Sequence, residues 1–243
     1  RRIVDHISDI NMPLTEHARN YLIKEGINPE TIIKTGSCMQ EVLDFYSDKI
    51  EKSKICKTLK VSSDDFFLIS SHREENVDLP DRLLSLLTSL NSLAEEFDKE
   101  IFFSVHPRTQ ARLDNLKNKS LNPKVNFMKA IGFIDYIKLQ KEAFCVISDS
   151  GTISEESSIL NFPAITIRQA HERPEGMDEG LLIMSDLVPE KVLNAVKIVT
   201  SSNQKNKRLL NRVADYDGGR VSMKVVRIIH SYTDYINRVV WRN

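Results

Sequence analysis

The sequence lacks the features that mark several common classes of protein. Its three cysteines, Cys38, Cys56 and Cys145, are far apart and odd in number, which argues against a disulfide framework and a CxxC zinc site. No apolar run approaches the roughly 18 residues that a membrane span needs, and the first residues show no charged-then-apolar leader. We therefore expect a cytoplasmic protein that does not bind membranes.

The sequence also has no excess of either charge. Lys plus Arg and Asp plus Glu number 34 each, so the formal net charge is zero. Without an overall positive field, nucleic acid and anionic membranes are not expected as partners. The 243 residues, 41% of them hydrophobic, are nevertheless enough to bury the core of a large domain.

Several short motifs of nucleotide and metal chemistry are missing. The sequence contains neither the P-loop GxxxxGK[ST] nor the dinucleotide fingerprint GxGxxG, and it has no GxSxG nucleophile elbow. It also has no HExxH and no carboxylate cluster with metal-ligand spacing, so we expect no metal ion.

The sequence does contain a regular alternation of apolar and amphipathic segments. The apolar segments show little polar alternation, which is typical of strands buried on both faces of a parallel sheet. These predicted strands are 65–70, 100–105, 125–128, 144–148, 163–167 and 181–184. Helical spacing is found at 79–97, 108–116, 134–143, 152–161 and 188–202. The alternation predicts an α/β fold with a doubly wound parallel sheet.

The two ends of the chain differ from this pattern. The N-terminal part suggests short strands at 9–15 and 31–35, a helix at 16–26 and a long helix from Ser37 to about Leu59. Gly36 could mark a domain junction. Residues 221–240 predict a long final helix with no strand after it.

In an open α/β sheet the ligand lies beyond the carboxyl ends of the strands, so the residues that follow each strand carry most information. These are 70–76, 106–108, 130–133, 149–152 and 168–176. The turn Ser150-Gly151-Thr152 precedes a helix, whose free N–H groups and dipole favour an anion, although a simple helix cap fits as well. His72, Arg73, His106 and Arg173 follow neighbouring strands and could converge on the same phosphate.

Two charged groups near these strand ends have alternative interpretations. Glu155 or Glu156 could accept hydrogen bonds from a ribose diol, or could simply complement the dipole in the first turn of a helix. The cluster at 172–175 could be a salt-bridged surface turn. His72 could assist the departure of a diphosphate, because histidine titrates nearest neutral pH, or could be a hydrogen-bonded loop residue.

Three motifs together resemble one protein family. SHREEN (71–76), SDSGTISEESSILNFPAITIR (148–168) and HERPEG (171–176) resemble, in that order and spacing, the non-hydrolysing UDP-N-acetylglucosamine 2-epimerases. The resemblance runs through nearly the whole chain. It implies a GT-B type fold of two Rossmann-like domains around a UDP-sugar cleft. Residues 37–215 would be the complete C-terminal UDP-binding domain, 1–36 a remnant of a largely absent N-terminal domain, and 216–243 a helix returning toward that domain.

The resemblance also implies a reaction. The family inverts C2 of a UDP-linked 2-acetamido sugar by anti elimination of UDP to a glycal and re-addition on the other face, without a metal or redox cofactor. The full-length protein would be a homodimer. The Asp and Glu residues that move the C2 proton would belong to the N-terminal domain, so this chain alone is expected to bind UDP without turnover.

Individual roles follow from the matched positions. The resemblance implies that His72 and Arg73 contact the diphosphate, with His72 also assisting UDP departure, and that Ser150, Gly151 and Thr152 hold the phosphates. It implies that Glu156 holds the ribose hydroxyls and that the backbone near Phe133 recognises uracil. It further implies that Arg173 supports the sugar-diphosphate end, that Arg1 lies near the sugar, and that His106 matches a regulatory second UDP-sugar site of some bacterial members.

Within the family, residues 156–176 and 228–241 resemble the branch that makes UDP-N-acetyl-L-fucosamine from its L-talo epimer for capsule or O-antigen. Glu74 departs from the pattern of the main branch, many members of which have a second arginine there. Two other functions stay open from the sequence. One is a GT-B glycosyltransferase, which would also need an acceptor site, and the other is a non-catalytic UDP-sugar sensor.

Overall fold

The structure is a computed structural model that describes residues 2–105, 107–115, 121–170, 173–201 and 208–242. The chain forms two compact units. One comprises residues 46–211, and the other combines residues 1–45 with 212–243. The candidate site lies in the unit 46–211. The domain division implied by the family resemblance stays a prediction about the longer protein.

The unit 46–211 contains a six-stranded sheet in the order β3-β2-β1-β4-β5-β6, and its strand pairs are parallel. The strands are β1 (Phe66–Ser70), β2 (Glu100–Val105), β3 (Val125–Lys129), β4 (Cys145–Ser148), β5 (Ala164–Thr166) and β6 (Ile183–Met184). Each lies within or nearly within a predicted strand. The prediction of a parallel sheet is therefore confirmed.

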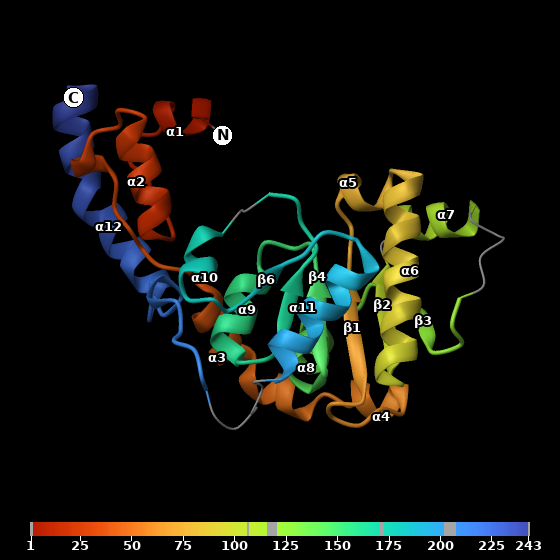
Figure 1. Cartoon of the computed structure of the whole chain (residues 1–243). Helices are drawn as coiled ribbons and strands as arrows, with labels where there is room; N and C mark the ends of the chain where they lie inside the picture. Colours follow the sequence, from red (N-terminus) through yellow and green to blue (C-terminus); the bar gives the residue numbers. More distant parts are fainter. Residues whose placement is uncertain (1, 106, 116–120, 171–172, 202–207, 243) are drawn as a thin grey trace. The chain divides into compact units, whose positions relative to one another are not determined.

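Helices cover both faces of this sheet (Figure 1). After α3 (Met39–Lys52), the helices of this part of the chain are α4 (Ile55–Leu59), α5 (Glu74–Val77), α6 (Pro80–Phe97), α7 (Pro107–Asn115), α8 (Phe133–Glu142), α9 (Ile153–Leu160), α10 (Pro174–Asp178) and α11 (Pro189–Ser201). Side chains of α6 and α11 pack with Phe67 and Ile69 on one face. Side chains of α4, α8 and α9 pack with Phe66 and Leu68 on the other. Successive residues of β1 are thus buried on opposite faces, which explains its continuous apolar sequence.

The direction in which strands are added reverses between β1 and β4. From β1 the chain proceeds to β2 and β3 on one side, and β4 continues to β5 and β6 on the other. This reversal is the topological switch point, where ligands bind in open α/β sheets. Ser70 of β1 is aligned with Ser148 of β4, so the two loops that follow start at the same level of the sheet.

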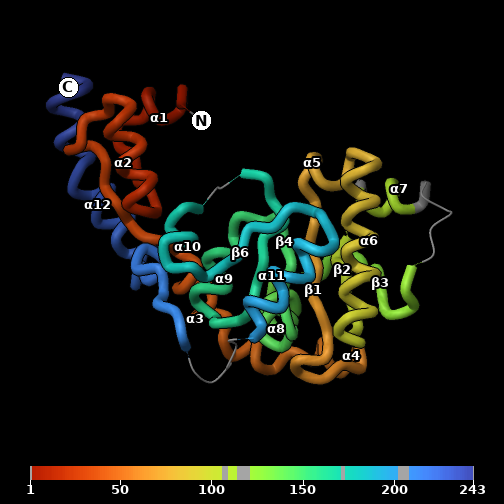
Figure 2. The backbone as a smooth tube through the Cα atoms, viewed as in Figure 1, coloured from red at the N-terminus to blue at the C-terminus, as the bar shows by residue number. Residues whose placement is uncertain are grey.

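The other unit joins the two ends of the chain, drawn in red and blue in Figure 2. It contains α1 (Arg2–Ile7), α2 (Glu16–Lys24), a 3-10 turn (Pro29–Thr31) and, beyond a second 3-10 turn (Ala214–Tyr216), the helix α12 (Val221–Ile236) with its π-helical end (Asn237–Trp241). Lys224 Nζ donates to the carbonyl of Thr35 at 3.1 Å, and Trp241 Nε1 donates to Asp9 at 3.4 Å. These bonds link segments that are about 190 to 230 residues apart.

Two predictions for the N-terminal part were wrong. The segments 9–15 and 31–35 form no strands but only an isolated parallel bridge between Asn11 and Ile32. Pro13 has no N–H to extend this ladder. The predicted helix from Ser37 to Leu59 is two helices, α3 and α4, because Ser53 intervenes. Ser53 Oγ accepts from the backbone N–H of Ile55 at 3.3 Å and donates to Asp135 at 2.5 Å, which replaces helical hydrogen bonds.

Gly36 provides a test of packing in the unit formed by residues 1–45 and 212–243. Its φ is +85°, and a Cβ would lie 2.8 Å from Gly218 Cα. Gly26 has nearly the same φ, +87°, but open space around it. We expect Gly26→Ala to cost about 1 kcal/mol from backbone strain alone, and Gly36→Ala to cost about 1–3 kcal/mol more from the clash. Urea unfolding followed by Trp241, the single tryptophan, measures both. Equal costs for the two variants would contradict this account.

Candidate functional site

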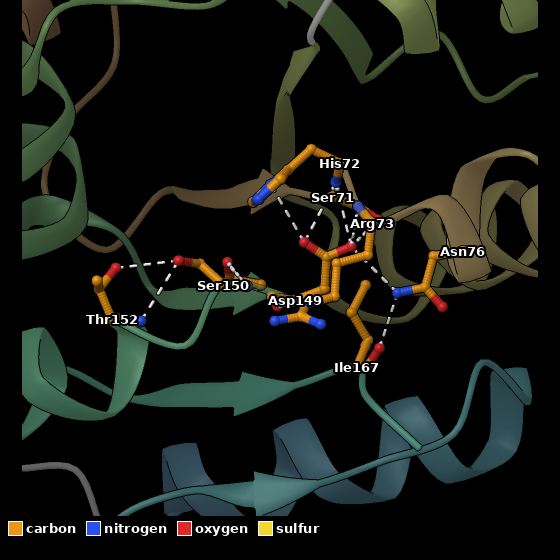
Figure 3. A network of polar contacts seen from close by, with 9 residues as sticks. Ser71, His72, Arg73, Asn76, Asp149, Ser150, Thr152 and Ile167 are labelled. Atoms are coloured by element: carbon orange, nitrogen blue, oxygen red, sulfur yellow. Dashed lines mark hydrogen bonds and ion pairs between the residues drawn. The ribbon is translucent and has the colours of Figure 1, made fainter. Parts of the chain in front are cut away.

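A buried carboxylate organises the switch point. Asp149 follows β4 directly and is 0% exposed. Its carboxylate accepts from Ser71 Oγ at 2.8 Å, from the backbone N–H of His72 at 3.1 Å and from that of Arg73 at 3.0 Å. Figure 3 shows these donors surrounding it. A buried charge is costly unless donors replace its lost water, and the loop after β1 supplies them.

The same carboxylate orients His72. His72 Nδ1 lies 3.3 Å from Asp149 Oδ1, while the His72 side chain is 55% exposed. A carboxylate only accepts, so this contact favours a proton on Nδ1 and leaves Nε2 to face another group. Arg73 is fixed from the other side, because its Nε donates to the backbone carbonyl of Asp149 at 2.9 Å. A cation and an imidazole are thus held together at the end of β1.

The turn before α9 provides further polar groups. Ser150 N–H bonds to Ser148 Oγ at 3.1 Å, and the hydroxyls of Ser150 and Thr152 lie 3.0 Å apart. Thr152 is the N-cap residue, but its side chain makes no capping hydrogen bond. The simple-cap interpretation therefore does not hold for Thr152, whereas Ser150 Oγ accepts from the backbone N–H of Thr152 at 3.4 Å. The N-terminal N–H groups of α9 and the helix dipole can face an anion instead.

The two glutamates of α9 have different partners. Glu155, 3% exposed, forms an ion pair with Arg173 at 2.7 Å. Glu156, 7% exposed, accepts from Gln140 Nε2 of α8 at 2.5 Å. Burial raises the pKa of Glu156 above its ordinary value, although the hydrogen bonds from Gln140 and Thr152 oppose the increase. The surroundings of Glu156 therefore disfavour its ionised form.

Phe133 begins α8, directly after the N-cap residue Gly132. Phe133 is 38% exposed, and its ring packs edge-on against Tyr46, with the ring centroids 6.0 Å apart. The same helix carries Gln140, the partner of Glu156. Helix α8 therefore links the loop after β3 to the carboxyl group on α9.

A small pocket lies beside the turn at Ser150. Its lining includes Ser150, Thr166, Arg168 and Arg173, and its volume of about 20 Å³ holds roughly one water molecule. Among the described residues, Thr166 Oγ1 is buried there without a hydrogen-bond partner. Two guanidinium groups and two hydroxyls make this pocket suited to a small anionic group.

The structure thus brings together most of the residues that the sequence singled out. Asp149 joins His72 and Arg73 to the turn at Ser150, and α9 carries Glu156 and the partner of Arg173. Arg1 and His106 lie outside the described residues. Sequence reasoning missed the roles of four residues, namely Asp149, Asn76, Gln140 and Glu155. A signal existed for Asp149, an acidic residue placed directly after an apolar strand.

Two further features were sought in the part of the chain that the structure describes. No group of three His, Cys, Asp or Glu side chains comes together there as a metal-binding cluster. Each helix in that part is too short or too polar to span a membrane.

Comparison with known families gives a match over most of the chain. The model of the UDP-N-acetylglucosamine 2-epimerases matches residues 1–230. The chain belongs to this family. A UDP-N-acetylglucosamine 2-epimerase of Methanococcus maripaludis is 33% identical over 232 residues, which are 93% of this chain and 63% of the relative. That of Methanocaldococcus jannaschii is also 33% identical, over 94% of this chain and 63% of its own.

Solved structures of 2-epimerases are similar as well. The structure of the UDP-N-acetylglucosamine 2-epimerase from Rickettsia bellii matches with a TM-score of 0.92 at 52% identity, over 100% of this chain and 65% of that one. The M. jannaschii 2-epimerase in complex with UDP-GlcNAc and UDP matches with a TM-score of 0.83 at 32% identity, over 95% of this chain and 63% of that one. These similarities confirm the α/β, GT-B type fold class. The chain spans less than two thirds of the length of these 2-epimerases.

The raised pKa of Glu156 predicts a specific pH dependence of stability. The folded chain keeps the Glu156 proton above the ordinary value of 4.5, whereas the unfolded chain releases it there. Stability from this group therefore falls as the pH rises from that value through the folded pKa. Glu156→Gln has no proton to lose, so we expect its melting temperature to rise relative to that of the wild type as the pH is increased from below 4.5 toward neutral.

Thermal unfolding of both proteins across this pH range measures the gain. Glu95→Gln, at an exposed position of α6, is the matched control and should show no such trend. A constant difference between Glu156→Gln and the wild type at every pH would contradict the assignment of a raised pKa.

Proposed function

We propose that the protein is a UDP-sugar 2-epimerase, an isomerase, and that the unit 46–211 binds the UDP. The observation that supports this most is the convergence of His72, Arg73 and the N-terminus of α9 at the switch point. A diphosphate needs donors and positive charge in one place. The complex of the M. jannaschii relative with UDP-GlcNAc and UDP supports the choice of ligand.

The diphosphate would lie against the end of β1 and the start of α9. In this proposal the hydroxyls of Ser150 and Thr152 and the backbone at Gly151 bind its oxygens, and Arg73 neutralises its charge. His72, held through Nδ1, presents Nε2 to the leaving oxygen. Arg173, fixed by Glu155, supports the end of the diphosphate that carries the sugar. Each charged group would keep a partner before and after the ligand binds.

The nucleoside would extend toward α8. Glu156 accepts hydrogen bonds from the two ribose hydroxyls, and the backbone near Phe133 recognises the uracil edge. Gln140 holds Glu156 Oε2. Burial makes the Glu156 carboxyl hard to ionise. The ribose hydroxyls would add hydrogen-bond donors, so ligand binding would stabilise its carboxylate form.

The proposed reaction has two balanced steps. In the first, a base removes the proton from C2, the C1–O bond breaks, a C1–C2 double bond forms and UDP leaves with the electron pair. In the second, the diphosphate oxygen adds back to C1 while C2 is protonated on the opposite face. In its doubly protonated form, with Nδ1–H facing Asp149, His72 would donate the Nε2 proton or a hydrogen bond to the departing diphosphate, which lowers the barrier to C1–O cleavage. Arg1 is proposed to lie near the sugar, and the groups that move the C2 proton are not assigned to this chain.

Two sugar pairs are candidates for the substrate. The names of the relatives favour UDP-N-acetylglucosamine and its C2 epimer. The motifs at 156–176 and 228–241, together with Glu74, favour the L-talo and L-fuco pair, with a role in surface polysaccharide synthesis. We also propose a cytoplasmic location, a homodimer for the full-length protein and a second regulatory UDP-sugar site that includes His106.

Calorimetry with UDP and NMR in D₂O test this proposal on one sample. We expect UDP to bind the chain, and Arg73→Gln to weaken binding about tenfold because a charge-assisted contact is lost. Arg112→Gln, at an exposed site on α7, is the control and should bind as the wild type does. Failure of the wild-type chain to bind UDP would refute the UDP site.

The NMR measurement follows deuterium at sugar C2 with UDP-N-acetylglucosamine and the UDP-linked L-talo sugar in parallel. Exchange into one of them would establish 2-epimerase chemistry and identify the sugar. Binding without exchange is expected if this chain carries only the UDP-binding part. Transfer of the sugar to an acceptor would instead support the glycosyltransferase alternative.

A further inference from the structure

A second polar network lies behind Asp149. The side-chain amide of Asn76, on α5, donates to Asp149 Oδ2 at 3.1 Å and to the backbone carbonyl of Ile167 at 3.0 Å. Asn76 is 0% exposed, and Figure 3 shows its nitrogen between these two acceptors. Ile167 directly follows β5, so one amide group connects the loops after β1, β4 and β5.

The orientation of this amide is set from the outside by Arg82. Asn76 Oδ1 accepts from Arg82 Nη2 at 3.1 Å. Arg82, on α6, uses Nη1 to bind Asp186 at 2.5 Å, and the same carboxyl oxygen accepts from the backbone N–H of Leu187 at 2.8 Å. Asp186 lies in the loop after β6. The network therefore spans the carboxyl edge of the sheet from β6 to β1.

The residue types match this arrangement. Asp149 and the Ile167 carbonyl only accept, so they need a donor, and the Arg82 guanidinium only donates, so it needs an acceptor. A neutral amide satisfies both sides at once, whereas a carboxylate at position 76 would repel Asp149. Arg82 also has the planar fork that allows it to bind Asn76 and Asp186 together, which a lysine could not reproduce.

We propose that Arg82 and Asp186 are positioning residues for His72: they orient Asn76, which holds the Asp149 carboxylate, which in turn favours a proton on His72 Nδ1 and turns Nε2 toward the UDP, to which Nε2 donates once it is protonated as well. The role toward UDP rests on the proposed function. The effect on His72 does not, because it concerns the chain without ligand. Arg82 lies on α6 outside the groups assigned to UDP, so it would act through Asn76 and Asp149.

The tautomer of His72 is the decisive measurement. Correlation of the imidazole carbon-bound protons with the ring nitrogens of the ¹⁵N-labelled chain, above the pH at which histidine titrates, distinguishes Nδ1–H from Nε2–H. The His72 signals are assigned by their loss in His72→Asn. We expect Nδ1–H to predominate in the wild type. In Arg82→Gln we expect a shift toward Nε2–H, the form that an unconstrained imidazole prefers. We also expect UDP binding to weaken by about tenfold, because the ring is no longer held with Nε2 toward the UDP.

Three variants keep the test decisive. Asp186→Asn removes only the outer partner, whose side chain is 40% exposed, so it tests the network even if Arg82→Gln unfolds. In an Asn76→Ala background Arg82→Gln should have no further effect on the tautomer, since the connection is already cut. Arg112→Gln should leave the His72 spectrum unchanged.

The outcomes separate this inference from the proposed function. A wild-type His72 spectrum in both Arg82→Gln and Asp186→Asn would overturn the positioning role. A shifted tautomer with UDP affinity within about twofold of the wild type would support the positioning role and assign His72 to UDP departure rather than UDP binding. If the wild-type chain binds no UDP, the proposed function fails, while the tautomer comparison still decides the inference.

Discussion

A carboxylate without water must be surrounded by donors, and the candidate site depends on how Asp149 meets this constraint. Its side chain is fully buried, and its partners come from the loop after β1 and from α5. These bonds determine where the backbone of His72 and Arg73 can lie. The groups offered to a ligand are therefore positioned by a residue that is itself inaccessible to that ligand.

The sheet topology explains why this network forms between residues more than 70 positions apart. β1 and β4 are neighbours only because the chain reverses its direction of winding between them. Two loops at the carboxyl edge are consequently brought to the same level. The N-terminus of α9 follows immediately, so the positive end of a helix dipole and the cationic side chains lie at the same edge of the sheet.

The local sequence predicted the secondary structure well where a strand is buried on both faces. The strand segments at 65–70 and 144–148 are apolar on both faces, and the structure buries them on both faces. The local sequence predicted helix ends less well where a single polar side chain competes with the backbone for hydrogen bonds. Ser53 ends α3 through bonds that helical spacing does not reveal. The segments at 9–15 and 31–35 have strand-like composition but form only one bridge, because Pro13 has no N–H to extend the ladder.

The sequence by itself determined the fold class, the order of strands and helices along the chain, and most of the residues at the strand ends, since periodicity and residue type are local properties. The tertiary structure alone decided which of these residues meet. It separated Glu155, paired with Arg173, from Glu156, held by Gln140, and it joined Asn76, Arg82 and Asp186 behind Asp149. Such partnerships depend on the distance between strand ends in space, which follows from strand order in the sheet and not from spacing along the chain.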